Sequence, residues 1–77
     1  MPTFFIIEGV KIEFFYNDHV PPHFHATIAE FEALISIRDQ QIIKGDLPKN
    51  KRKKILKWSA ENETILMEIW ESMRTDN

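Results

Sequence analysis

The feature that most constrains the fold is an abrupt change of hydrophobic periodicity at Gly45-Asp46-Leu47-Pro48. Before this point apolar and polar residues alternate, as in Lys11–Tyr16, which is typical of half-buried strands. After it, apolar residues from Ile55 to Met73 recur at helical spacing. Because Pro48 suits the first turn of a helix, the four residues predict a strand-to-helix junction. We therefore expect a sheet first and helices second.

The residues before this junction predict antiparallel hairpins. Thr3–Glu8 and Lys11–Tyr16, separated by Gly9, predict the first. A second follows if Ala29 and Glu30 form a two-residue turn, although Ala-Glu is a poor type I′ turn. In the strand register that this turn sets, apolar residues pair with apolar residues on one face of the sheet. A shift of the register by one residue would end this separation of apolar from polar residues. The apolar face carries Phe24, Ala26, Ile28, Phe31, Ala33 and Ile35.

A short fifth strand is expected at Gln41–Lys44. Beyond it, the apolar spacing allows one long helix or two shorter helices with a break near Ser59–Asn62. The charges favour the break, because it would place lysines at the end of a first helix and glutamates at the start of a second, where each complements the helix dipole. The residues concerned are Lys54, Lys57, Glu61 and Glu63.

The length of the chain limits it to one domain, covering residues 1–77. We expect an α+β fold: a small antiparallel sheet of four to five strands within residues 1–45, then one long or two shorter C-terminal helices within residues 48–75, packed on one face. There is no cysteine, which excludes disulfides and thiolate–zinc sites. No window is apolar enough to span a membrane and no signal peptide is evident, so a cytoplasmic protein is expected. A domain this small gains stability by association, either as a homo-oligomer or with a partner.

All three histidines fall within Asn17–His25, whose sequence is Asn-Asp-His-Val-Pro-Pro-His-Phe-His. The expected register places His23 and His25 on the same face of one strand, where residues i and i+2 can chelate one ion. Glu32 lies diagonally opposite His25, within reach of a long side chain. His23, His25 and Glu32 are therefore candidate ligands of a divalent metal such as Zn²⁺ or Mn²⁺.

Metal-free acid–base catalysis is an alternative use of the same segment. Imidazoles can act as general acid and base on a phosphodiester, because they titrate near neutral pH. The candidate catalytic residues are Asp18, His19, His23 and His25. A third alternative is structural: the histidines are solvated or contact a partner, and Asp18 belongs to a turn.

Six of the ten basic residues gather in Lys49–Lys57. Lys49, Lys53 and Lys57 share one helix face, where their mutual repulsion carries a small cost. Together with Arg52 they are candidate residues for binding nucleic acid or an acidic partner. A solvated helix face is the alternative, and the net charge of −2 is unlike that of dedicated nucleic-acid binders.

The string from Tyr16 to His25 resembles the signature of a small bacterial family known as domain of unknown function 4160. The resemblance extends over nearly the whole chain. It includes Met1-Pro2-Thr3, Glu30-Phe31-Glu32-Ala33, Gly45-Asp46-Leu47-Pro48, Trp58 and Trp70. Two positions depart from it: many members carry Gly where Ala29 stands, and some carry His where Asn62 stands.

The resemblance implies one component of a two-gene system. Members are often encoded beside a second small protein, of domain of unknown function 2442, in an arrangement similar to a toxin–antitoxin pair. It implies no established catalytic residue. Our leading expectation is an interaction module whose segment Asp18–His25 binds a small protein partner encoded nearby, with nucleic acid as a further ligand. The competing expectation is a small metal-dependent or acid–base hydrolase, such as a nuclease whose lysine-rich helix holds the phosphate backbone.

Overall fold

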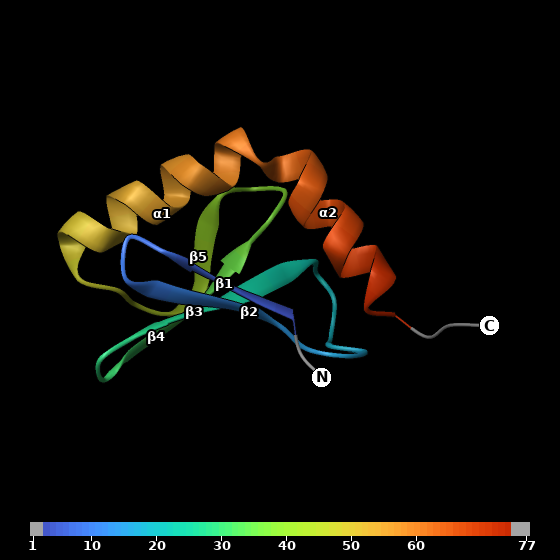
Figure 1. Cartoon of the computed structure of the whole chain (residues 1–77), viewed down its shortest axis with the longest axis horizontal. Helices are drawn as coiled ribbons and strands as arrows, with labels where there is room; N and C mark the ends of the chain where they lie inside the picture. Colours follow the sequence, from blue (N-terminus) through green and yellow to red (C-terminus); the bar gives the residue numbers. More distant parts are fainter. Residues whose placement is uncertain (1–2, 75–77) are drawn as a thin grey trace.

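The computed structural model of the chain describes residues 3–74 and has a five-stranded antiparallel sheet followed by two helices (Figure 1). The elements are β1 (Thr3–Ile7), β2 (Val10–Phe14), β3 (His23–Ile28), β4 (Phe31–Ser36), β5 (Gln41–Gly45), α1 (Lys49–Glu61) and α2 (Glu63–Ser72). The strand order in the sheet follows the order in the chain. The expected α+β class is confirmed; of the expected four to five strands the sheet has five, and two shorter helices form rather than one long helix.

The β3–β4 hairpin has the register that the sequence predicts. The pairs are His23 with Ser36, Phe24 with Ile35, His25 with Leu34, Ala26 with Ala33, Thr27 with Glu32 and Ile28 with Phe31. Ala29 closes the turn with a left-handed φ of 53°. This conformation is strained for a residue with a Cβ atom. The apolar pairing therefore sets the register, although the turn residues do not favour it.

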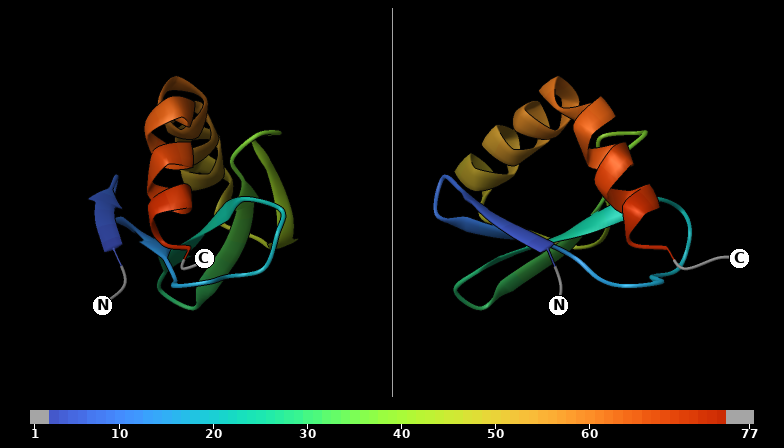
Figure 2. Two further views of the ribbon diagram at one scale, coloured as in Figure 1. Left: turned by 90° about the vertical axis from the view of Figure 1, so that its right-hand side faces the viewer. Right: turned by 45° about the vertical axis from the view of Figure 1, so that its right-hand side comes forward.

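Both helices lie on one face of the sheet (Figures 1 and 2). The core between helices and sheet is formed by Val10, Ile12, Phe14, Phe24, Ala26, Ala33, Ile35, Ile37, Leu47, Ile55, Leu66, Trp70 and Met73. Trp58 of α1 packs onto this layer, with its ring centroid 6.3 Å from that of Phe5 and 6.0 Å from that of Phe24. Phe31 is 38% exposed, because it lies next to the β3–β4 turn, which projects away from the helices (Figure 1).

The break between α1 and α2 falls at Asn62, within the range that the sequence predicts. The predicted placement of the lysines is wrong. Because α1 continues to Glu61, Lys54 and Lys57 lie inside the helix and no basic residue occupies its last turn. Packing explains the difference: Trp58, directly after Lys57, packs against Phe5 and Phe24, and burying this apolar side chain is worth more than the roughly 0.3–1 kcal/mol of a charge–dipole interaction.

Candidate functional site

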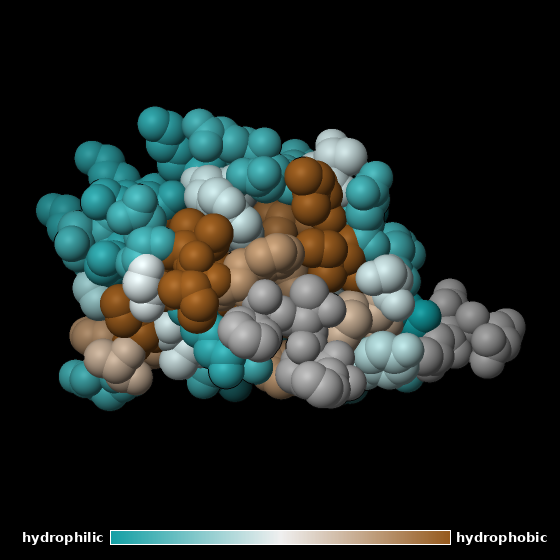
Figure 3. Space-filling view, in the orientation of Figure 1, coloured by the Kyte–Doolittle hydropathy of each residue, from teal (hydrophilic) through white to brown (hydrophobic). Residues whose placement is uncertain are grey.

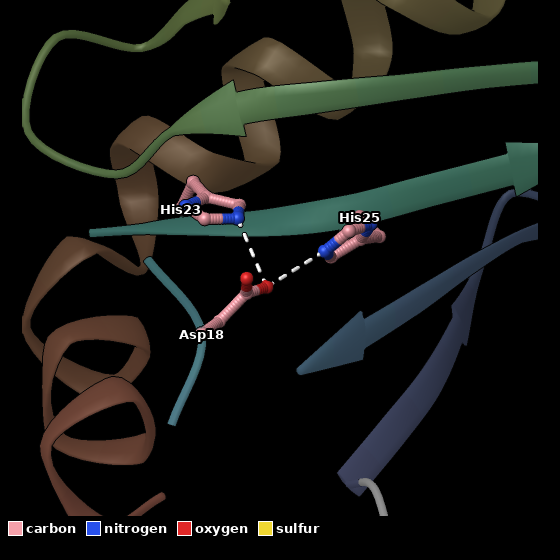
Figure 4. Close-up of side chains that lie close together, drawn as sticks. All are labelled: Asp18, His23 and His25. Atoms are coloured by element: carbon pink, nitrogen blue, oxygen red, sulfur yellow. Dashed lines mark hydrogen bonds and ion pairs between the residues drawn. The ribbon is translucent and has the colours of Figure 1, made fainter. Parts of the chain in front are cut away.

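Asp18, His23 and His25 converge at the start of β3 (Figure 4). Asp18 comes from the loop between β2 and β3. The two histidines flank the core residue Phe24, so by the alternation of the strand both imidazoles project on the side opposite to Phe24. One ligand atom from each residue lies within 4.8 Å of the other two. The carboxylate is central, since Asp18 Oδ2 lies 2.9 Å from His25 Nε2 and 3.0 Å from His23 Nε2.

His23 is buried, with only 4% of its surface exposed. Its Nδ1 lies 2.7 Å from the carbonyl oxygen of Pro21. A carbonyl can only accept, so Nδ1 carries the proton and, in the neutral ring, Nε2 carries the lone pair. That Nε2 faces the carboxylate of Asp18 but makes no hydrogen bond within residues 3–74. Two acceptors at 3.0 Å repel one another unless a cation lies between them.

His25 has a carboxylate on each side of its ring. Its Nε2 interacts with Asp18, and its Nδ1 lies 3.5 Å from Glu32 Oε2 without forming a hydrogen bond in the described part of the chain. The edge of the ring packs on Phe15, at a centroid distance of 4.6 Å. Glu32, expected as a metal ligand, thus faces the nitrogen that points away from Asp18. In metal sites, a carboxylate in this position accepts a hydrogen bond from the second nitrogen of a metal-bound histidine and so orients the ring.

The loop that carries Asp18 is tied to the end of α2. The Asn17 N–H donates to the Met73 carbonyl at 2.9 Å, and Arg74 Nη1 donates to the Asp18 carbonyl at 3.1 Å. The Asp18 side chain also accepts a hydrogen bond from the His19 N–H at 2.9 Å. The carboxylate position therefore depends on the residues just after α2, of which Arg74 lies 56 residues further along the chain.

Trp70 closes the cluster from the side of α2. It is 3% exposed, and its ring centroid lies 5.2 Å from that of His23. Arg74 lies over the same indole, 5.5 Å from the ring centroid. The sequence does not indicate a part in the site for either residue. Its helical spacing identifies Trp70 only as one of the apolar residues of the helical segment, and Arg74 belongs to no sequence motif.

The pKa of Asp18 is lower than its ordinary value. Burial of the carboxyl group raises the pKa, but the hydrogen bond with His25, the His19 N–H and the charges of protonated His23 and His25 together lower it further than burial raises it. The side chain is therefore ionised near neutral pH, as a metal ligand must be.

His19, a candidate catalytic residue, does not belong to the cluster. Its side chain is exposed, and only its backbone contacts Asp18. The cluster therefore consists of two of the three histidines.

The basic residues of α1 lie at the other end of the molecule, next to the turn between β1 and β2 (Figure 1). Lys51 Nζ donates to the Glu8 carbonyl at 2.8 Å, and Lys54 Nζ lies 3.5 Å from the Glu8 carboxylate. Arg52 pairs with Asp46 at 2.9 Å. Within α1, three exposed lysines have no hydrogen bond or ion pair to any residue from 3 to 74: Lys49, Lys53 and Lys57. Hydrophilic side chains gather over α1, whereas hydrophobic ones gather over β1 and α2 (Figure 3).

Comparison with known proteins identifies a family. The family model described as Domain of unknown function (DUF4160) matches residues 9–71, which include the whole Asp-His cluster. No curated protein and no solved structure matches the chain. Among the described residues, neither helix is long and apolar enough to cross a membrane.

Proposed function

We propose that this chain, which belongs to the family described as Domain of unknown function (DUF4160), binds a divalent metal ion through Asp18, His23 and His25. The observation that carries the proposal is the buried Nε2 of His23, whose lone pair faces a carboxylate oxygen 3.0 Å away. A cation between the two atoms removes their repulsion.

A metal ion explains the cluster better than protons do. Without a metal, both nitrogens that face the Asp18 oxygen would need protons, and His23, whose Nδ1 already holds one, would become a buried imidazolium. A charged ring is costly to bury, even beside a carboxylate. One divalent ion satisfies both nitrogens and the carboxylate together.

The donor set indicates a catalytic type of centre. Two imidazole nitrogens and one carboxylate oxygen suit Zn²⁺, and also Mn²⁺ or Fe²⁺, and they leave coordination positions free for water. A zinc ion held by Asp18, His23 and His25 would activate a water molecule for attack on esters or amides near neutral pH. The function we propose is that of a small metal-dependent hydrolase.

The test is a metal titration of untagged, metal-free protein. We expect it to take up one Zn²⁺ or Mn²⁺ per chain by mass spectrometry, with a melting temperature that rises with the metal and falls again in EDTA. Co²⁺ should quench the fluorescence of Trp70, whose ring packs against His23. A Trp58→Phe variant leaves Trp70 as the sole tryptophan and assigns the signal.

Matched variants locate the ion. Asp18→Asn keeps the shape of the side chain and should weaken binding by about 100-fold or more, as should His25→Gln. His19→Ala is the control, because it removes an exposed histidine from the same loop. Absence of stoichiometric metal from the wild-type protein, or equal loss in His19→Ala, would contradict the proposal.

A partner-binding function is the second candidate. Two apolar side chains on the same loop favour it, since Tyr16 is 61% exposed and Val20 is 69% exposed. The partner would be the second small protein of the two-gene, toxin–antitoxin-like arrangement that the family resemblance implies. Co-expression with the neighbouring gene product tests this: Tyr16→Ser with Val20→Ser should abolish co-purification and leave metal content unchanged. Undiminished co-purification of the double variant would exclude this surface.

A further inference from the structure

A hollow opens on the outer face of the sheet, directly beside the candidate metal centre. It has a volume of about 320 Å³ and is lined by His25, Glu32, Leu34, Lys44 and Gly45. Strand pairing sets this arrangement, because His25 pairs with Leu34 and Leu34 with Lys44, which places three side chains in a row. His25 lines the hollow and also belongs to the cluster with Asp18, so the two adjoin at this residue.

Lys44 gives the hollow an uncompensated positive charge. Its ammonium group has no hydrogen bond or ion pair with any described residue, unlike Lys51 and Lys54, which bind Glu8. Leu34, which is half-buried, forms an apolar surface between Lys44 and His25. The hollow therefore offers one cation and one apolar surface, and it shares His25 with the proposed metal centre.

Glu32 does not cancel this charge locally. Its carboxylate lies 3.5 Å from Nδ1 of His25, the nitrogen that carries a proton once Nε2 binds a metal. A divalent ion and Lys44, set against Asp18 and Glu32, leave one net positive charge in the combined site. A ligand with one negative charge matches it.

We infer that the hollow and the metal centre together bind a phosphodiester, with one phosphoryl oxygen on the ion, a second on Lys44 and an ester substituent on Leu34. The inference rests on the proposed metal site and names its ligand class. A phosphodiester carries the single negative charge required, metal ions bind phosphoryl oxygens, and lysine binds phosphate as a point charge. The volume is close to the lower limit of ligand sites, about 300 Å³, and so suits one small diester or one unit of a longer chain.

The experiment measures binding of diphenyl phosphate, a singly charged diester, to zinc-loaded protein by calorimetry. Diphenylacetate, with the same phenyl groups on a carboxylate, is the comparison ligand. We expect a single site for diphenyl phosphate, about tenfold weaker in Lys44→Met. Zinc affinity should be unchanged in this variant. Lys53→Met, at an exposed and unpaired lysine of α1, should bind as the wild type does.

The outcomes separate the inference from the metal proposal. Equal affinity in Lys44→Met and wild type overturns the use of the hollow, and equally tight binding of diphenylacetate overturns the choice of a phosphodiester. Normal zinc uptake without diphenyl phosphate binding overturns the inference and leaves the metal site standing. Lys44-dependent binding to a protein that takes up no zinc supports the hollow and contradicts the metal site.

Discussion

The two polar regions of this molecule, the Asp-His cluster and the lysine-rich helix α1, are built in opposite ways. The cluster gathers side chains from a loop and a strand and is closed by α2, whose Trp70 packs against the buried His23. The lysines come from one continuous stretch of α1. Lys51, Lys54 and Arg52 bind nearby acidic or carbonyl groups, and the rest face solvent.

The difference indicates which region is the better candidate for specific chemistry. A buried nitrogen that lacks a partner costs free energy, so its position requires an explanation beyond the fold. Exposed lysines are solvated at little cost and require none. The two regions also lie apart in the molecule. The helix α1 begins beside the β1–β2 turn, whereas the cluster lies against the end of α2 (Figure 1). The lysine row is therefore not adjacent to the proposed centre.

The largest expected effect is that of Trp70→Ala, which removes the side chain shared by the core and the cluster. Truncating a buried tryptophan should lower the free energy of unfolding by about 3–5 kcal/mol, measured by urea denaturation. Ile65→Ala on the same helix is the control, because Ile65 is 54% exposed. Its cost should be about 0.5 kcal/mol. Similar losses in the two variants would mean that α2 does not support the cluster through Trp70.

A smaller effect is expected for Arg74→Ala. Without the hydrogen bond from Arg74 to the Asp18 carbonyl, the loop should hold its carboxylate less firmly. Zinc affinity should then fall by about tenfold, as is typical when a residue that positions a ligand is lost. Calorimetric zinc titrations measure this, with Arg38→Ala, at an exposed arginine, as the matched variant. An unchanged zinc affinity in Arg74→Ala would show that the loop needs no support from α2.

At the other end of the molecule, Lys49→Glu should stabilise the protein. The first turn of α1 holds no acidic residue, whereas that of α2 holds Glu63. A carboxylate at this position interacts favourably with the helix dipole and should add about 0.3–1 kcal/mol. The reciprocal Glu63→Lys should cost a similar amount, and thermal melts at low salt measure both. A destabilised Lys49→Glu would reveal a structural role for the lysines.

The smallest effect concerns Asp46, next to α1. Its pKa is lowered by the hydrogen bond from the Leu47 N–H, raised by desolvation, and lowered again by Arg52. A depressed folded-state pKa stabilises the protein above the ordinary value of about 3.9, and this contribution disappears as pH falls through the folded value.

Carboxyl titrations by NMR measure the pKa directly. Arg52→Gln should raise the pKa of Asp46 only partly, because the Leu47 N–H is the larger cause, and Lys49→Gln should leave it unchanged. Complete reversal in Arg52→Gln would assign the shift to the ion pair.

Much of the architecture follows from local periodicity. Alternation fixes which residues of β3 and β4 face the core, and it places His23 and His25 on the same face in the observed register. The junction at Gly45–Pro48 and the break at Asn62 also follow from local signals. Local charge preferences were a poorer guide, since α1 continues past its lysines to bury its apolar face.

By itself, the sequence determined the order of strands and helices, the strand register and the segment that holds the site. Only the tertiary structure decided that Asp18 joins the two histidines, that Glu32 faces the other side of His25, and that His19 stays exposed. The physical reason is that periodicity sets the direction of a side chain within its own element. Convergence instead depends on the path of a loop and the packing of α2, which residues distant in the chain determine together.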